Sequence, residues 1–223
     1  MCGRYTLSSR PEALQLLFEL EALPPLAPRY NIAPTQAVPV VRQHGAGREM
    51  TLMRWGLIPS WAKDPGIGAR LINARAEGAA DKPAFRAAFR RRRCLIPADG
   101  FYEWRNQNGR KQPFYFRRED GTPFAFAGLW EHWHGPDGAE IESCTILTTD
   151  ANARVRPIHD RMPVILERAD FDLWLDPAIS DPELLQPLLA PYPPAQMTGY
   201  PVSSSVNSPK HDDPALVTPL AEP

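Results

Sequence analysis

Residues 93–149 read RCLIPADGFYEWRNQNGRKQPFYFRREDGTPFAFAGLWEHWHGPDGAEIESCTILTT. Short runs of aromatic and β-branched residues alternate here with turns rich in Gly, Asn and Asp, a spacing typical of successive hairpins. The expected fold class is therefore α+β, a single domain with a barrel-like antiparallel β-sheet and a few peripheral helices. Strands are predicted over residues 94–96, 101–104, 113–116, 124–130 and 142–148.

The flanking sequence adds one more hairpin and several short helices. A helix is expected to start near Pro11, and Asp81 is expected to cap another over residues 82–92. Strands over residues 37–43 and 49–55 surround a glycine-rich turn, which indicates a hairpin. Two late helices are expected over residues 170–175 and 182–189.

Length and composition exclude several classes of protein. The chain has 223 residues, of which 43% are hydrophobic and 23% charged, values that exclude global disorder, collagen and coiled coils. Its 26 prolines disfavour long helices, because an interior proline removes a hydrogen-bond donor and clashes with the preceding turn. No stretch reaches the roughly 18 apolar residues that span a bilayer, so no membrane association is expected.

Charge is unevenly distributed along the chain. Residues 1–175 contain 24 Lys and Arg against 20 Asp and Glu, whereas residues 176–223 contain one Lys and six acidic residues. The stretch from Pro191 onward is rich in Pro and Ser and is expected to be extended or partly disordered, although residues 201–209 could add a terminal strand. We therefore expect a domain over residues 1–208 and an acidic, proline-rich tail over residues 209–223.

The three cysteines, Cys2, Cys94 and Cys144, follow no disulfide or zinc spacing. Their odd number favours a reducing compartment. The first residues lack the basic and apolar regions of a signal peptide, so a cytoplasmic location is expected.

Cys2 is the most informative single residue. Removal of Met1 would leave a 1,2-aminothiol at the chain end, with an amine whose ordinary pKa is about 8 and a thiol near 8.5. Such an amine can condense with an aldehyde to an imine, and the thiol can then close a five-membered thiazolidine ring. An internal cysteine lacks the amine and cannot do this. The alternative is that Cys2 is an incidental small residue after the initiator.

Two further residues are candidates for proton transfer. His159 and Glu103 each combine an ionisable group with aromatic or apolar neighbours, surroundings that suit a general acid or base. The alternatives are a structural pairing of His159 with Asp160 and an outward-facing Glu103 on a strand. Asn73 and Arg75, two residues apart on an extended segment, would face the same side.

Arginines and tryptophans suggest contact with nucleic acid. Trp55 and Trp61 surround a Gly/Pro bend, and either both are core residues or one exposed ring forms a stacking platform for an unpaired base. Arginine favours bidentate contacts with phosphate. The candidates for phosphate contacts are Arg4, Arg75, Arg154, Arg156 and Arg161.

His132 and His134 lie on one face of a predicted strand and could form a metal-binding pair. No third ligand at a recognisable spacing supports such a site. No metal site and no cofactor are therefore expected.

Seven motifs together resemble the SRAP family, the SOS response-associated peptidases, which includes bacterial and animal abasic-site processing proteins. The motifs occur in the family's order from Cys2 to about Val164. They are MCGR (1–4), YNIAP (30–34), WGLIPSW (55–61), NARAE (73–77), RCLIP (93–97), GFYEW (100–104) and HDRMP (159–163).

The resemblance implies a barrel-like SRAP fold with a cleft for single-stranded DNA, loss of Met1, and a thiazolidine between Cys2 and the aldehyde of an abasic deoxyribose. By motif, Asn73 would hold the amine or the sugar, and Glu103 with His159 would serve ring opening, proton transfer and crosslink reversal. Basic positions that hold flanking phosphates match Arg4, Arg75 and Arg161, and the apolar wall against the nucleotides matches Pro34 and Trp61. The expected DNA-contacting set further includes Asn31, Arg154 and Arg156.

The expected partner is single-stranded DNA that contains an abasic site, bound by a monomer associated with the bacterial nucleoid, with replication-fork proteins as further candidates. Met1 removal could be autocatalytic or the work of methionine aminopeptidase, and the imine could give weak lyase activity. A class II glutamine amidotransferase also begins with Met-Cys-Gly, but its Asn-Gly oxyanion motif is not evident, since Asn108-Gly109 falls in a predicted turn. The other alternative is a non-covalent single-strand binder, for which Cys2 would be dispensable.

Overall fold

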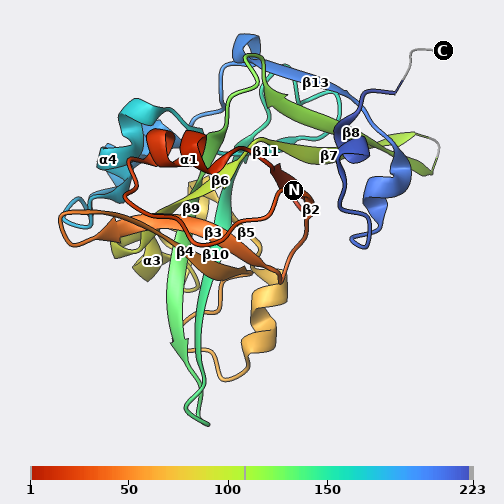
Figure 1. Ribbon diagram of the computed structural model, residues 1–223. Coiled ribbons are helices and arrows are strands. Elements are labelled where there is room, and N and C mark those ends of the chain that lie inside the picture. Colours follow the sequence, from red (N-terminus) through yellow and green to blue (C-terminus); the bar gives the residue numbers. More distant parts are fainter. Residues whose placement is uncertain (1, 108, 221–223) are drawn as a thin grey trace.

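The centre of the fold is a closed ring of five strands (Figure 1). The computed structural model describes residues 2–107 and 109–220. Strand β9 pairs with β10 and so closes the path β10-β4-β3-β6-β9, in which every contact is antiparallel except the parallel pair β4–β10. The ring strands are β3 (Ala37–His44), β4 (Gly47–Trp55), β6 (Arg93–Ala98), β9 (Phe124–His134) and β10 (Glu140–Asp150).

A second sheet of five strands lies beside the barrel, in the order β13-β8-β7-β1-β2. Its β7–β8 hairpin is one of the hairpins expected from the sequence. The sheet's strands are β1 (Tyr5–Leu7), β2 (Arg29–Ile32), β7 (Gly100–Gln107), β8 (Arg110–Arg118) and β13 (Met197–Pro201). In the turn between β7 and β8, Asn108 lies outside the described residues.

The predicted strands are found, but the predicted continuous meander is wrong. Strands β6 and β7 are consecutive in sequence yet belong to different sheets, because the chain crosses between them at Asp99 and Gly100. Asp99 accepts hydrogen bonds from Ser8 Oγ at 2.9 Å and from the Ser9 backbone N–H at 3.0 Å. A Cβ on Gly100 would lie 2.4 Å from the ring of Tyr115, so this crossing requires glycine.

The two sheets share a core close to the start of the chain. The Tyr5 ring packs edge-on against Trp55 at 5.3 Å and Phe126 at 5.7 Å between centroids. All three side chains are fully buried. Strand β1 is therefore held against the barrel, and the residues that precede it have a defined position.

Short elements complete the fold. The additional strands β5 (Asn73–Arg75), β11 (Arg161–Pro163) and β12 (Ile165–Leu166) extend the barrel sheet. The α-helices are α1 (Pro11–Phe18), α2 (Ala76–Ala79), α3 (Arg86–Arg91), α4 (Phe171–Leu175) and α5 (Pro182–Leu185). The 3-10 helices are η1 (Pro65–Arg70), η2 (Arg168–Asp170), η3 (Gln186–Leu189), η4 (Pro194–Gln196), η5 (Ser204–Asn207) and η6 (Pro214–Val217).

Helix α3 is shorter than expected and Asp81 does not cap it. Pro83 disfavours the helical conformation of Lys82, and the helix begins only at Arg86. Across residues 2–107 and 109–220, no helix is long and apolar enough to cross a bilayer.

The expectation of an extended or disordered C-terminal stretch is wrong for residues 191–220. Val202, Val206 and Leu216 are almost completely buried, in a small cluster with Tyr102 and Tyr115. The terminal strand lies at residues 197–201, a few residues earlier than predicted, and pairs with β8. Residues 209–220, the described part of the expected tail, pack against the domain.

Candidate active site

Cys2 lies next to Glu103 because β1 pairs with β7. Tyr5 is opposite Phe101, and the backbone N–H of Tyr102 donates to Arg4 O at 3.0 Å. The same register places Glu103 opposite Gly3, the neighbour of Cys2. The Cys2 side chain is fully buried, and its Sγ lies 3.9 Å from Arg4 O.

Electrostatics connect Cys2 with Glu103. Burial raises the pKa of the Cys2 thiol well above its usual value, and the negative charge of Glu103 raises it further. The thiol is therefore neutral in this structure. It can act as a nucleophile only together with a base that accepts its proton.

Glu103 itself is 2% exposed. Burial raises the pKa of its carboxyl group, and the positive charge of a protonated His159 opposes that rise. Both residues line one hollow of about 350 Å³, whose other walls are Trp104, Asn106, Lys111 and Asn207. A carboxyl group with a raised pKa beside an imidazole is suited to move protons near neutral pH.

The position of His159 depends on its own backbone. Its N–H donates to Val155 O at 3.0 Å, and its Nδ1 accepts a hydrogen bond from the Arg161 N–H at 3.0 Å. The pairing with Asp160 anticipated as an alternative is also present, with 3.1 Å between Nδ1 and Oδ1. The same Nδ1 also lies 3.3 Å from Arg161 O, so three contacts of this one nitrogen fix the orientation of the ring.

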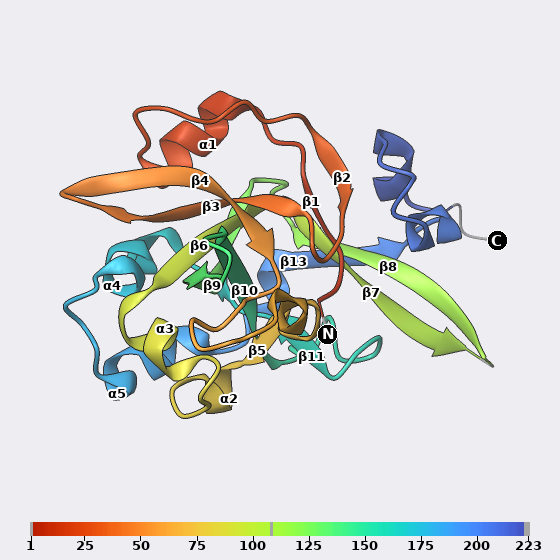
Figure 2. The ribbon, with the colours of Figure 1, turned by 90° about the horizontal axis from the view of Figure 1, so that it is seen from below.

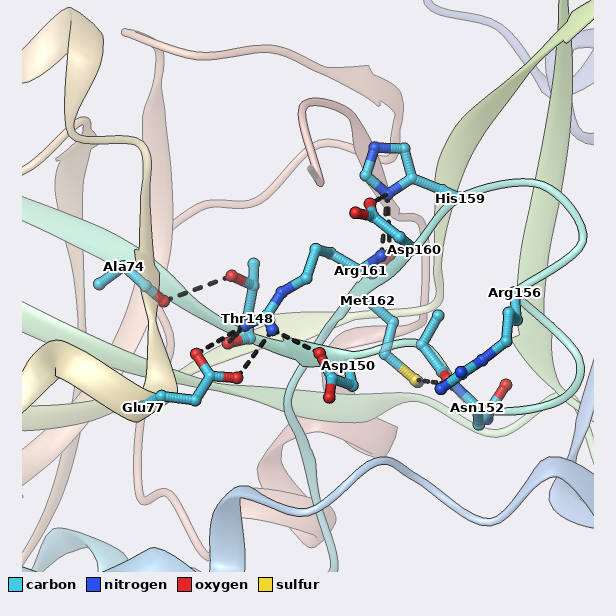
Figure 3. A network of polar contacts seen from close by, with 11 residues as sticks. Ala74, Glu77, Thr148, Asp150, Asn152, Arg156, His159, Asp160, Arg161 and Met162 are labelled. Carbon is cyan, nitrogen blue, oxygen red and sulfur yellow. Dashed lines mark hydrogen bonds and ion pairs between the residues drawn. The ribbon is translucent and has the colours of Figure 1, made fainter.

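Arg161 points away from His159, toward two carboxylates (Figure 3). Its guanidinium binds Glu77 with two contacts, at 2.7 and 3.0 Å, and Asp150 at 2.7 Å, and it donates to Thr148 O at 2.7 Å. Only 9% of Arg161 is exposed. The hydrogen bond from Arg161 lowers the pKa of Glu77. The expected phosphate contact of Arg161 would require this network to open.

Asn73 begins β5, which pairs in parallel with β10 opposite Ile146. Both ribbon views place β5 and β11 beside the first residues of the chain (Figures 1 and 2). The Asn73 Nδ2 donates to Ile72 O at 3.0 Å, whereas its buried Oδ1 has no hydrogen-bond partner among the described residues. A buried acceptor without a partner costs about 1–3 kcal/mol, so this oxygen is available to a donor on a ligand.

The remaining predicted DNA-contacting residues divide into two groups. Trp61 is 59% exposed while Trp55 is completely buried, and Arg75 and Arg154 are also exposed. Pro34 is half-buried. Arg156 is exposed, but its guanidinium donates to Ala151 O at 2.7 and 3.2 Å.

Arg4 and Asn31 bind the C-terminal segment. Arg4 donates to Asn31 Oδ1 at 2.8 Å and to Val206 O at 2.6 Å. The fully buried Asn31 amide donates to the carbonyls of Val206, Ser208 and His211. In this structure the Asn31 side chain is therefore turned away from solvent and holds the C-terminal segment, so its expected DNA contact stays a prediction.

Four residues of the hollow were missed by sequence reasoning, namely Trp104, Asn106, Lys111 and Asn207. Lys111 is exposed on β8 and follows from the β7–β8 register, in which it is opposite Asn106. Asn207 accepts a hydrogen bond at its Oδ1 from Trp104 Nε1 at 2.7 Å. It belongs to a segment that was expected to be extended, and no pattern in the neighbouring sequence indicates a site residue there.

A larger hollow of about 470 Å³ lies between α1 and α4 and is lined by none of the predicted site residues. Its charged residues Arg118 and Asp120 bind each other at 2.9 Å. Glu103 and His159 thus line the smaller hollow of about 350 Å³ rather than the larger one.

Comparison with known proteins connects this geometry to a family. Residues 1–209 match the family SOS response associated peptidase (SRAP). The chain belongs to the SRAP family. The abasic site processing protein YoqW of Bacillus subtilis is 44% identical over 221 residues, covering 97% of this chain and 99% of that protein. The abasic site processing protein YedK of Escherichia coli is 33% identical over 227 residues, covering 99% and 100%.

Solved structures share the fold. A crystal structure of a protein from Bacteroides thetaiotaomicron superposes with a TM-score of 0.87 at 27% identity, over 99% of this chain and 100% of that one. The expected single α+β domain with a barrel-like sheet and few helices is thereby confirmed.

Proposed function

We propose that this SRAP protein captures abasic sites in single-stranded DNA as a covalent thiazolidine on Cys2 and so shields the lesion from strand cleavage. The observation that carries the proposal is the position of Cys2 next to a buried Glu103, which shares a hollow with His159. The names of its relatives, which are abasic site processing proteins, support the same proposal.

The chemistry requires the free α-amine that remains after Met1 is removed. This amine attacks the aldehyde carbon of the ring-opened sugar, and loss of one water molecule gives an imine. The Cys2 sulfur then adds to the imine carbon while the thiol proton moves, through a base, to the nitrogen. The closed thiazolidine holds the sugar carbon and prevents the β-elimination that would cut the strand.

Each proton transfer has a candidate residue. The carboxyl group of Glu103, with its raised pKa, is a stronger acid-base partner at neutral pH than an ordinary glutamate and lies within electrostatic reach of the thiol. His159, which lines the same hollow as Glu103, is suited to protonate the sugar ring oxygen during ring opening. The Asn73 Oδ1 would accept a hydrogen bond from the amine or from a sugar hydroxyl. The same residues would serve reversal.

DNA binding would use the exposed residues around the hollow. Arg75 and Arg154 are exposed and can approach phosphates, and Trp61 offers an exposed indole on which a base can stack. Pro34 is half-buried and offers a smaller apolar surface. Lys111 at the rim of the hollow is an additional phosphate candidate. Arg4 and Arg161 would act mainly by holding the site in shape.

Two secondary activities are part of the proposal, one from the imine intermediate and one at the Met1–Cys2 peptide bond. Release of the imine before ring closure would give weak lyase activity, and hydrolysis of the Met1–Cys2 peptide bond could be autocatalytic or performed by methionine aminopeptidase. Monomeric action, nucleoid association and contact with replication-fork proteins stay predictions.

The test is a denaturing gel of the purified protein incubated with single-stranded DNA that carries one abasic site, beside intact DNA and the Cys2→Ala variant. We expect a slow-migrating, heat-resistant band that requires both the lesion and Cys2. Mass spectrometry should give the sum of the two masses less one water and less Met1. A protein that lacks Met1 and forms no such band contradicts the proposal.

The alternatives predict different results. Glutaminase activity that depends on Cys2 would favour an amidotransferase. Equal affinity of the Cys2→Ala variant for abasic and intact strands, with no covalent band from the unaltered protein, would favour a simple single-strand binder.

A further inference from the structure

The end of the β9–β10 hairpin carries a second group of chemistry-bearing residues, remote from Cys2. In Figure 1 these two strands run down beyond the rest of the fold, away from the N mark. His132 and His134 lie on β9 and Glu140 on β10. Because His134 is opposite Glu140 and His132 is opposite Glu142, these side chains share one face of the hairpin.

The three side chains already approach the spacing of metal ligands. His134 Nε2 lies 3.2 Å from Glu140 Oε1, and His132 Nε2 lies 3.5 Å from Glu140 Oε2. One ligand atom from each residue can be chosen so that all three lie within 4.8 Å of one another. Ligand atoms around a tetrahedral zinc ion, with bonds of about 2.0–2.1 Å, are roughly 3.3 Å apart, so small side-chain rotations suffice.

The hairpin under these residues is firmly held. On its other face, Trp133 Nε1 donates to Ala62 O at 2.7 Å. At its tip, the Gly135 N–H donates to Ala139 O at 2.7 Å. Binding an ion would therefore not have to order the backbone first.

One further acidic residue, Glu142, lies on the same face of the hairpin as His132, His134 and Glu140. Glu142, the fourth acidic or imidazole residue of this face, binds Arg42 at 2.6 Å. The guanidinium of Arg42 in turn lies over Trp130, 4.5 Å from the ring centroid. Arg42 also binds Glu49 at 2.6 Å, so Glu142 shares this one cation with a second carboxylate. Because Glu142 is held by Arg42, two imidazoles and the Glu140 carboxylate remain to bind an ion.

We propose that His132, His134 and Glu140 form a three-ligand site for a divalent transition-metal ion such as Zn²⁺, with the remaining coordination position open to solvent. Two imidazole nitrogens favour Zn²⁺, Ni²⁺ and Cu²⁺, whereas Mg²⁺ and Ca²⁺ take oxygen ligands. All three proposed ligands belong to the β9–β10 hairpin, so the proposal does not depend on the function proposed for Cys2.

The position of the third ligand in the sequence explains why the sequence analysis predicted no metal site. Glu140 follows His134 across a turn, a spacing that matches no zinc motif, and only the hairpin register brings it opposite. The expectation of no metal site was based on this missing ligand.

Isothermal titration of metal-stripped, full-length protein with Zn²⁺ tests the proposal. His134→Gln and Glu140→Gln remove ligands at exposed positions where folding is not at risk. His44→Gln is the matched control, because His44 is an exposed hairpin histidine 3.3 Å from Glu49 without a second imidazole. Cys2→Ala removes the aminothiol, which could itself bind zinc.

We expect the unaltered protein, His44→Gln and Cys2→Ala each to bind one equivalent of Zn²⁺, and the two ligand variants to bind it at least about tenfold more weakly. Zn²⁺ should also raise the melting temperature of the unaltered protein and of His44→Gln but not of His134→Gln. Unchanged affinity in His134→Gln, loss of binding in Cys2→Ala, or no binding by the unaltered protein would overturn the proposal.

Discussion

Glu103 combines a cost in stability, from the burial of its carboxyl group, with a proposed role in proton transfer, and a comparison of two pH values separates the two. Since burial raises the pKa of its carboxyl group, the folded state holds this proton more tightly than the unfolded chain, whose glutamates titrate near 4.3. Stability from this group is therefore present at acid pH and is lost as pH rises through the unfolded value toward the folded one.

The Glu103→Gln variant carries no ionisable group at this position, so it does not lose stability as pH rises. We expect the variant to have a higher melting temperature than the unaltered protein at pH 7–8 and an equal one near pH 4. Each kcal/mol of added stability should raise the melting temperature by about 2–4 °C. Thermal unfolding at both pH values measures the difference, and covalent capture of abasic DNA should fall sharply in the same variant. An equal difference at the two pH values would show that the buried charge is not the cause.

A comparison of Arg161 with Arg75 tests which arginine supports the structure and which binds DNA, as proposed above. Arg161→Gln breaks the contacts with Glu77 and Asp150 and should cost about 1–2 kcal/mol at pH 7, a modest value because Glu77 is half exposed. Because Arg161 lowers the pKa of Glu77, this contribution is present above about pH 4.3 and is lost as pH falls. Urea midpoints at pH 7 and below pH 4 measure it.

Arg75→Gln is the matched variant at an exposed position. Its stability should change by less than about 0.5 kcal/mol. Its affinity for single-stranded DNA should decrease, and the salt dependence should become shallower by about 0.7 for the lost phosphate contact. An Arg161→Gln variant that is fully stable but defective in DNA binding would instead restore Arg161 to the phosphate-contacting group.

At the scale of elements, the proline excess has a local explanation. All four Asp-Pro pairs place the Asp Oδ1 2.8–2.9 Å from the backbone N–H two residues later, in Gly66, Ala178, Glu183 and Ala215. Three of them cap η1, α5 and η6 with proline in the first turn. Several acidic residues of the C-terminal stretch are therefore turn and cap residues, which explains why its composition suggested a loose tail.

Asp212 attaches this stretch to the domain. Its carboxylate binds the Arg29 side chain and accepts from the backbone N–H groups of Tyr30, at 2.5 Å, and Asn31, at 2.9 Å. Asp212→Ala leaves those N–H groups without this partner and should cost about 1–3 kcal/mol. The control is Lys210→Ala at an exposed position of the same segment, which should stay within about 0.5 kcal/mol. Equal urea midpoints for both variants would contradict the anchoring role.

At the scale of the whole molecule, barrel closure shields the thiols of Cys94 and Cys144 from reagents in solution. Cys94 on β6 and Cys144 on β10 are fully buried inside the fold, and burial raises the pKa of both thiols. Native protein should therefore resist alkylation at both positions until it unfolds, and a Cys94→Ala/Cys144→Ala variant should still capture abasic DNA. Mass mapping after a brief iodoacetamide pulse measures this. Labelling of Cys94 in folded protein would contradict the closed barrel.

The sequence by itself determined the positions of the central strands and the motifs that contain Cys2, Asn73, Glu103 and His159. These features are local, since turn residues and alternating burial act over a few positions along the chain. Only the tertiary structure decided that β6 pairs with β9 rather than β7, that Asn31 and Arg161 turn inward, and that Glu140 faces two histidines. Those outcomes depend on barrel closure, in which strands far apart in the sequence compete for partners, and no local pattern records which pairing buries the most apolar surface.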